Sequence, residues 1–273
     1  MARRRASTGS DLGRRVLVAI PAIAFAITII YLGDVWFALG ALALGLVCLH
    51  ELFVMLDRLR PVRLAGFLGV AGMVLAAAVG DERSVLLAMA AFVPVLFALA
   101  LVGPRRERVT LGLAATVLGV YWIGLGLAHA VLLRGLEHGG ALVFLVLLGT
   151  FLGDTGAYLG GRLLGTRRLA PRISPNKTWE GLGIGIVTGV FAVWYASRTY
   201  DGNWITGTEG LLLGLAVALA APVGDLFESL VKRDVGTKDT GGLFGVHGGA
   251  LDRLDAALFS LVAGYHVWLA TLT

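Results

Sequence analysis

Residues 35–56 read VWFALGALALGLVCLHELFVML, an apolar run with a single acid, Glu51, near its end. A run of about 20 residues with this composition is long enough to cross the hydrocarbon core of a bilayer as an α-helix. Lipid offers the backbone no hydrogen-bond partners, so a spanning segment must satisfy its polar groups within its own helix or a closed barrel. The run does not alternate between apolar and polar residues as a barrel strand does. It therefore predicts a transmembrane helix.

Similar runs recur along the whole chain. Only 15% of the 273 residues are charged and 57% are hydrophobic, whereas about 25% of residues are charged in ordinary soluble domains. We predict an all-α fold, a polytopic membrane helix bundle of about nine transmembrane helices. The expected spans are residues 16–33, 35–56, 64–80, 84–103, 109–133, 140–161, 181–197, 209–231 and 254–272. The first could also be a signal peptide, but its apolar stretch is long for that role and no convincing cleavage site follows.

The distribution of positive charge predicts how the helices cross the membrane. All but three of the 23 Lys and Arg residues fall at the N-terminus or in loops that follow an even-numbered span. Such a bias is typical of the cytoplasmic side. We expect a multi-pass protein of the cell inner (plasma) membrane, with its N-terminus in the cytoplasm, its C-terminus outside and its active site facing the cytoplasm. The basic residues then face cytosol and anionic lipid headgroups, so the net charge of +5 does not require a nucleic-acid partner.

We expect two regions that differ in function. Residues 1–140 hold the first five spans and carry no motif, so we predict that they form a scaffold. Residues 141–273 hold the last four spans and two charged, glycine-rich cytoplasmic loops, 162–180 and 232–253. This second part is the predicted catalytic region.

Several residues are interpreted as structural. Cys48 lies inside an apolar run and is predicted to be a small core residue. His50 and Glu51, at the cytoplasmic end of the second span, are also assigned to the structure. Small residues recur at every fourth position of the seventh span, at Gly181, Gly185 and Gly189. This pattern predicts a close helix contact, either in a homodimer or within the monomer.

Charged residues inside the later spans point to a site. Asp154 and Asp225 lie within apolar runs, where a carboxylate is costly and usually faces a cavity or a partner. On a helix, Asp225, Glu228, Ser229 and Lys232 are spaced i, i+3, i+4 and i+7, so they share one face. A snorkelling helix end would explain Lys232 but not Asp225, whose side chain is short. The spacing therefore indicates a polar site at the cytoplasmic boundary.

The loop that follows this helix mixes acids, bases and glycines. Glycine lets backbone N–H groups approach an anion, basic side chains neutralise phosphate, and carboxylates hold Mg²⁺ together with phosphate oxygens. The residues concerned are Lys238, Asp239, His247, Gly248, Gly249, Asp252 and Arg253. The mixture suits a metal–polyphosphate site, whereas a patch for lipid headgroups alone would need only the bases. Solvated loops contain the same residue types, so composition alone leaves both readings open.

The earlier loop ends in a second candidate phosphate site. Ser174, Asn176 and Lys177 precede the seventh span, and polar groups at a helix N-terminus form a suitable cradle for an anion. Thr178 is predicted to cap that helix, with Glu180 in its first turn. The sequence contains neither G-x-x-x-x-G-K-[ST] nor H-E-x-x-H, so it does not predict a P-loop or a zinc protease site.

These motifs together carry a family resemblance. Residues 229–255 read SLVKRDVGTKDTGGLFGVHGGALDRLD and closely resemble the signature of the phosphatidate cytidylyltransferase family, the bacterial CDP-diacylglycerol synthases. The segments GDTGAYLGGR (153–162), ISPNKTWEG (173–181) and GDLFES (224–229) are similar to that family's blocks, in the same order. The first 140 residues carry no motif of this kind.

Four positions depart from the family pattern. The family usually has Pro-Gly before His-Gly-Gly, where this chain has Gly245 and Val246. The family usually has a bulkier aliphatic residue where this chain has Ala250, and it often has Ser where this chain has Ala256. All charged positions remain, so the departures affect the conformation of the loop more than its chemistry.

The resemblance implies a reaction and a cofactor. CTP and phosphatidic acid would give CDP-diacylglycerol and pyrophosphate, for phospholipid biosynthesis. Little covalent work falls to a protein in such a transfer, so positioning and charge neutralisation dominate. The implied cofactor is Mg²⁺, with Asp225 and Asp252 as metal ligands, and a second cation such as K⁺ is compatible with the site.

The resemblance also assigns roles to the remaining polar residues. The phosphates of CTP and lipid would contact four bases, Lys232, Arg233, Lys238 and Arg253. Asp239, His247, Gly248 and Gly249 would shape the nucleotide loop. Ser174, Asn176 and Lys177 would hold a phosphate, and Ser229 would contribute to substrate binding. Asp154 would orient a water ligand of the metal or a basic side chain.

Two other functions stay open from the sequence. A cytidylyltransferase or kinase that acts on another lipid, of the polyprenyl type, would need similar apolar walls. An ion-coupled transporter would also use buried acids such as Asp154 and Asp225, but the sequence shows no inverted repeat or matching pair of broken helices. The expected partners are CTP, phosphatidic acid and the lipid bilayer.

Overall fold

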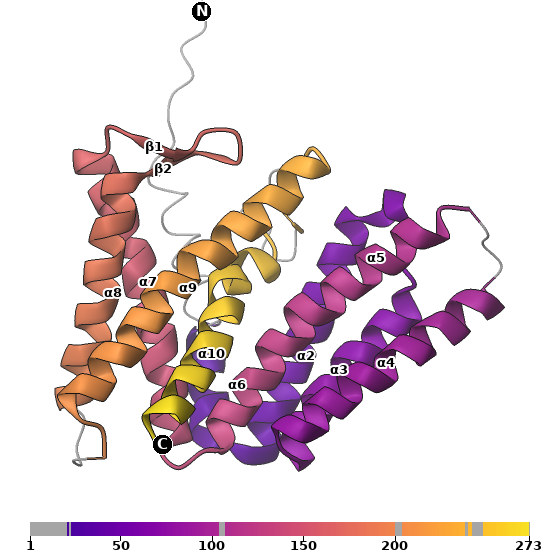
Figure 1. The fold of residues 1–273 in the computed structure, drawn as a ribbon, viewed down its shortest axis with the longest axis horizontal. Coiled ribbons are helices and arrows are strands. Elements are labelled where there is room, and N and C mark those ends of the chain that lie inside the picture. Colours follow the sequence, from indigo (N-terminus) through magenta and orange to yellow (C-terminus); the bar gives the residue numbers. More distant parts are fainter. Residues whose placement is uncertain are drawn as a thin grey trace, which may run out of the picture.

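The computed structural model describes residues 21, 23–103, 107–199, 204–237, 240–241 and 248–272. Within these ranges the chain forms long helices and one small β-hairpin (Figure 1). In chain order the elements are α2 (Asp34–Met55), α3 (Arg63–Val79), α4 (Glu82–Val102), α5 (Val109–Gly119), α6 (Leu125–Gly135), α7 (Gly139–Leu164), β1 (Arg168–Ala170), β2 (Ser174–Thr178), α8 (Trp179–Thr199), α9 (Gly207–Asp234) and α10 (Leu251–Thr271). A short apolar helix, Ile23–Leu32, precedes α2. A 3-10 turn, Asp57–Leu59, follows α2, and a π-helical turn, Val120–Gly124, joins α5 to α6.

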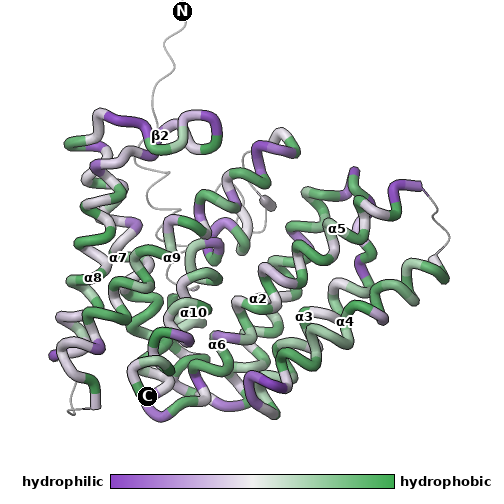
Figure 2. The backbone as a smooth tube through the Cα atoms, in the orientation of Figure 1, coloured by the Kyte–Doolittle hydropathy of each residue, from purple (hydrophilic) through white to green (hydrophobic). Residues whose placement is uncertain are grey.

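The helices have the length and composition of membrane spans. Among the described residues, seven helical segments are long and apolar enough to cross a bilayer: α2, α4, α5 to α6 as one segment, α7, α8, α9 and α10. The helix Ile23–Leu32 and α3 are shorter but also apolar, and they overlap the first and third predicted spans. Figure 2 shows hydrophobic residues along the helices and hydrophilic ones mainly at helix ends and in the hairpin. The prediction of an all-α polytopic membrane protein is confirmed, whereas the number of nine spans and the sidedness stay predictions.

Large apolar side chains fill the core of the first half. Leu49 and Phe53 of α2, Met73 of α3 and Ile123 of the π-helical turn are all almost fully buried. Cys48 is completely buried among them, which confirms its predicted place in the core. Close packing of this kind holds α2, α3 and α6 together.

Small residues instead hold α7 against α8. A Cβ added at Gly181 would lie 2.7 Å from the carbonyl oxygen of Ala157, and one added at Gly185 would lie 2.9 Å from that of Gly153. The two helix backbones therefore touch, as in other contacts between membrane helices with small residues at every fourth position. The predicted glycine contact is confirmed, and it lies within the monomer. The homodimer stays a prediction to which this stripe of glycines lends no support.

The loop between α7 and α8 contains a hairpin that the sequence did not predict. Strands β1 and β2 pair antiparallel. The Glu180 carboxylate accepts hydrogen bonds from the Thr166 hydroxyl at 2.6 Å and from the backbone N–H groups of Thr166 and Arg167, which closes the base of the hairpin. Thr178 accepts from the N–H of Gly181 at 3.1 Å, so its predicted role as the cap of α8 is confirmed.

The two predicted regions share one packed interior. Helix α10 contacts α6 and α2 of the first region as well as α9 and α7 of the second. The ring of Trp122, in the π-helical turn, lies edge-on against the ring of Phe227 in α9, with centroids 4.8 Å apart. π-Helical turns occur often at functional positions, and this one brings an aromatic side chain close to α9. The division of labour at residue 140 stays a prediction.

Candidate active site

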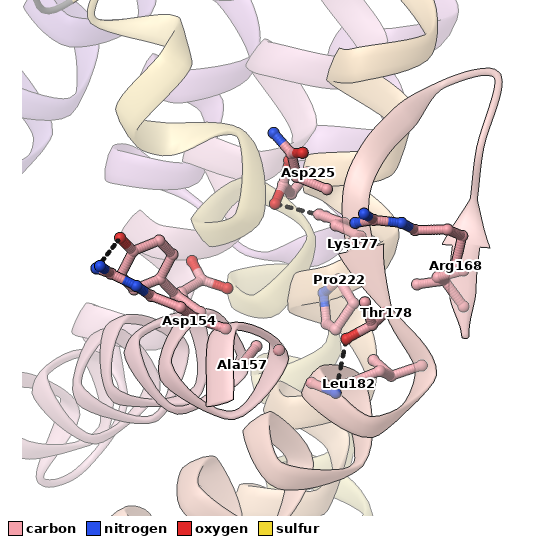
Figure 3. A pocket seen from close by; sticks show the side chains of 14 residues that line it. Asp154, Ala157, Arg168, Lys177, Thr178, Leu182, Pro222 and Asp225 are labelled. Carbon is pink, nitrogen blue, oxygen red and sulfur yellow. Dashed lines mark hydrogen bonds and ion pairs between the residues drawn. The ribbon is translucent and has the colours of Figure 1, made fainter. Parts of the chain in front are cut away.

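A cavity of about 510 Å³ lies between α7, the hairpin, α8 and α9. Figure 3 shows its lining, with Asp154 on one side and the Lys177–Asp225 contact facing it. Its charged and amide side chains are Asp154, Arg162, Arg168, Asn176, Lys177 and Asp225. Ala157, Leu169, Leu182 and Pro222 make part of the wall apolar. The cavity thus combines charged side chains with an apolar surface.

Lys177 and Asp225 form an ion pair in this cavity. The Lys177 Nζ lies 2.5 Å from the Asp225 Oδ2, and the two side chains are 25% and 33% exposed. Lys177 comes from β2 and Asp225 from α9, so the fold of the hairpin is what brings them together. Within the part of the chain that the structure describes, the Asp225 carboxylate also accepts a long hydrogen bond of 3.5 Å from the Ser229 hydroxyl. A ligand phosphate or a cation can therefore compete for either partner.

Asp154 adds a second carboxylate to the cavity. It projects from α7, and it interacts electrostatically with both Asp225 and Lys177. Two carboxylates and one ammonium group then share a single space. This set can bind a cation and an anionic phosphate together, because each oxygen or ammonium group finds an opposite charge on the ligand.

A second charged cluster lies deeper, between α9 and α10. The Lys232 Nζ is 2.5 Å from Glu228 Oε2 and 2.8 Å from Asp252 Oδ1. The side chains of Lys232, Glu228 and Asp252 are only 14%, 2% and 12% exposed. The contacts of Ser229 with Asp225 and of Lys232 with Glu228 confirm that these α9 residues share one face. Asp255, also buried, is an electrostatic neighbour of Glu228.

Asp252 holds several backbone groups as well as Lys232. Its carboxylate accepts from the N–H of Thr240 at 3.1 Å and from that of Gly249 at 2.7 Å. Gly248 has a φ of +82°, and a Cβ there would lie 2.5 Å from Asp252 Oδ2. Only glycine fits such a conformation at so close an approach. Asp252 thus joins α9 to both described ends of the glycine-rich loop.

The structure places the predicted site residues in these two groups. Asp154, Asn176, Lys177 and Asp225 line the cavity, while Lys232 and Asp252 belong to the deeper cluster. Three predicted residues, Lys238, Asp239 and His247, lie outside the described residues.

The other predicted residues lie around these groups. Ser174 begins β2 and does not line the described cavity, and Arg233 donates from Nε to the carbonyl oxygen of Ile173 at 3.2 Å, which ties α9 to the hairpin. Ser229 contacts Asp225, and Gly249 contacts Asp252. Arg253 lies exposed in the first turn of α10.

Several charged residues of the site were not predicted. Arg162 and Arg168 line the cavity, and Glu228 and Asp255 surround Lys232. A signal for Glu228 was present, since it shares the α9 face with Asp225. No pattern in the sequence singles out Arg168, because its position depends on the unpredicted hairpin.

The two predicted metal ligands differ in how free their oxygens are. No group of three or more His, Cys, Asp or Glu in the described part of the chain is arranged to hold a metal ion. Asp225 offers its carboxylate to the cavity beside Asp154. Both oxygens of Asp252 already accept hydrogen bonds from N–H groups or Lys232. The donors in the cavity fit Mg²⁺ that takes most of its ligands from phosphate and water, as this ion usually does.

The chain is similar to known proteins along most of its length. A family model described as "Cytidylyltransferase family" matches residues 13–271. A phosphatidate cytidylyltransferase of Brucella melitensis is 33% identical over 252 residues, which cover 90% of this chain and 89% of the relative. One of Mycobacterium leprae is 39% identical over 166 residues, 61% of this chain and 53% of the relative. The chain spans about half the length of the mycobacterial relatives that it matches.

Proposed function

Because the chain belongs to the cytidylyltransferase family, we propose that it transfers the cytidylyl group of CTP to phosphatidic acid, giving CDP-diacylglycerol and pyrophosphate. The observation that carries this proposal is the cavity with the Lys177–Asp225 pair, which joins charged groups to an apolar wall. A water-soluble triphosphate and a membrane lipid need such a mixed surface. We place the enzyme in the cell inner membrane with this cavity toward the cytoplasm, where CTP is found.

In the proposed reaction a phosphate oxygen of the lipid attacks the α-phosphorus of CTP. A new P–O bond forms as the bond to the β-phosphate oxygen breaks, and the electron pair leaves with pyrophosphate. The protein contributes by aligning the two phosphates and by neutralising their charge. Lys177 is suited to neutralising phosphate charge, because its ammonium group can change its partner from Asp225 to a phosphate oxygen without leaving the cavity.

Lys232 of the deeper cluster lies about two turns of α9 beyond Asp225. Lys232 is fixed between Glu228 and Asp252, so its position does not depend on a ligand. Asp252 in turn holds the N–H groups of Thr240 and Gly249. We assign this cluster to shaping the nucleotide loop beside the reacting phosphates.

We propose Mg²⁺ as the cofactor, held mainly by Asp225, with Asp154 beside it. When bound, Mg²⁺ would neutralise the polyphosphate and stabilise the leaving pyrophosphate. Asp252 could join as a ligand only after giving up some of its present hydrogen bonds. The Lys177 ammonium group contacts the Asp225 carboxylate, so it lies within reach of a phosphate that binds beside this carboxylate.

The test is the incorporation of labelled CTP into lipid by the purified full chain in detergent, with phosphatidic acid and with or without Mg²⁺. We expect labelled CDP-lipid and an equal amount of pyrophosphate, both lost when a chelator removes the metal. Polyprenyl phosphate in place of phosphatidic acid tests the alternative lipid substrate. A protein shown to be folded that makes CDP-lipid only from polyprenyl phosphate, or makes none from either, would overturn the proposal.

A further inference from the structure

An acid from the first region of the chain reaches the glycine-rich loop near the end of the second. Glu51 of α2 is 6% exposed, although it carries a carboxylate in an apolar helix. Its Oε2 accepts a hydrogen bond of 3.0 Å from the backbone N–H of Leu251, 200 residues later in the sequence. Leu251 is the first residue of α10. A buried carboxylate needs such a partner, because burial without one is costly.

This contact supplies a cap that α10 lacks in its own sequence. The residue before the helix is Ala250, which offers no side-chain acceptor. The first N–H groups of any helix have no partner within the helix, and its positive end attracts a carboxylate. Glu51 satisfies one of these groups from another helix. The start of α10 therefore depends on α2.

Two glycines pack directly against the Glu51 carboxylate. A Cβ at Gly241 would lie 2.6 Å from Oε1, and a Cβ at Gly249 would lie 2.3 Å from Oε2. The Oε1 atom is buried and has no hydrogen-bond partner among the described residues. Any larger residue at either glycine would push the carboxylate away from Leu251. Glu51 thus touches both described ends of the loop that Asp252 holds from the opposite side.

We propose that Glu51 is a positioning residue for the nucleotide loop. It fixes the first turn of α10 and the Gly249 peptide, and by doing so it keeps Asp252 in contact with Lys232. It acts through these residues and does not line the cavity that we assign to the reacting phosphates. Its kinetic consequence rests on the proposed function, in which this loop shapes the nucleotide site.

Three variants separate this role from general support of the fold. Glu51→Ala removes the acceptor, and Glu51→Gln keeps its size and one neutral acceptor oxygen. His50→Ala is the matched control, because His50 is exposed at the same end of α2. We expect the KM for CTP to rise about tenfold in Glu51→Ala, as the loss of a hydrogen bond to a charged acceptor implies. The rise should be smaller in Glu51→Gln, and the KM for phosphatidic acid should stay unchanged in both.

Hydrogen–deuterium exchange of the full chain in detergent gives a readout that needs no turnover. The amide of Leu251 should exchange about tenfold faster in Glu51→Ala than in the wild type or in His50→Ala. If the wild type forms no CDP-lipid, the proposed function fails, but this measurement still shows whether Glu51 holds the amide of Leu251. The proposal would be overturned if the Leu251 amide of Glu51→Ala exchanged at the wild-type rate. It would also be overturned if the KM rose equally for CTP and for phosphatidic acid.

A double variant gives an independent check in case Glu51→Ala does not fold. Gly249→Ala should raise the KM for CTP in the wild-type background because its Cβ displaces the Glu51 carboxylate. In the Glu51→Gln background, Gly249→Ala should raise the KM for CTP by a smaller factor than in the wild-type background, because the two changes disturb one contact. Fully additive effects would contradict a shared contact between Glu51 and Gly249.

Discussion

The Lys177–Asp225 pair and the Lys232–Asp252 pair join the same two side-chain types about two turns apart along α9, yet their surroundings differ. The first lies in the cavity, with side chains 25% and 33% exposed. The second lies between two helices, with side chains 14% and 12% exposed, and it includes the buried Glu228. The first is held mainly by one contact, and the second by contacts from several directions.

This difference in exposure indicates that the first pair serves ligand binding and that the second supports the fold. A partly exposed ion pair contributes about 0–1 kcal/mol to stability, because water competes for both partners. Removing one member of a buried group costs about 3–5 kcal/mol, because it leaves an uncompensated charge inside the protein. We therefore expect changes at the cavity pair to affect turnover alone, and changes at the deeper cluster to affect turnover and folding together.

The largest effect is expected for Lys232→Met. This change leaves the carboxylates of Glu228 and Asp252 facing each other without a cation, so the free energy of unfolding should fall by about 3–5 kcal/mol. CDP-lipid formation should be lost as well. Thermal unfolding of the purified protein in detergent measures the first quantity. A wild-type unfolding midpoint would show that the cluster does not support the fold.

Lys177→Ala should separate activity from stability. Removing a positioned positive group that stabilises transferring charge lowers turnover by about 10²–10³-fold. The unfolding free energy should change by less than about 1 kcal/mol, because the pair is partly exposed. Turnover and unfolding are measured on the same preparation. A turnover near that of the wild type would remove Lys177 from the proposed site.

Packing beneath the cavity should show a smaller effect. Gly185→Ala places a Cβ 2.7 Å from that of Ala157, so α7 and α8 must separate, at a cost of about 1–3 kcal/mol. Gly183→Ala on the same helix is the control, since nothing lies within 4 Å of its Cβ. That control should be neutral or stabilising. Equal unfolding midpoints for the two variants would contradict the close contact of the backbones.

The smallest effect is expected for an exposed pair far from both clusters. Arg60 Nη1 lies 3.3 Å from Glu107 Oε2, with side chains 42% and 82% exposed. Glu107→Gln should change stability by no more than about 0.5 kcal/mol and leave turnover unaltered. A larger loss of stability would mean that exposure does not explain the difference between the two pairs on α9.

Local patterns in the sequence predicted what depends on neighbours along one helix. Long apolar runs predicted the helices, the i, i+3, i+4, i+7 spacing predicted the shared face of α9, and Thr178 predicted the start of α8. These features follow from helix geometry and from the hydrogen-bonding needs of helix ends. No tertiary contact is required for any of them.

Contacts between distant segments could not be predicted in the same way. The pairing of Lys177 with Asp225 depends on the hairpin, whose short strands carry no clear alternation. The division of the charged residues into an open and a buried group depends on how α10 packs against α9. Glu51 was assigned to the structure as part of a lone His-Glu pair, and nothing nearby in the sequence indicates its partner, Leu251.

The most direct test of this division of roles compares Asp225→Asn with Asp252→Asn in one preparation of purified protein. For each variant, the rate of CDP-lipid formation and the midpoint of thermal unfolding are measured. We predict that both variants lose turnover and that only Asp252→Asn unfolds at a lower temperature than the wild type. Near-normal turnover in either variant, or the same unfolding shift in both, would contradict the account.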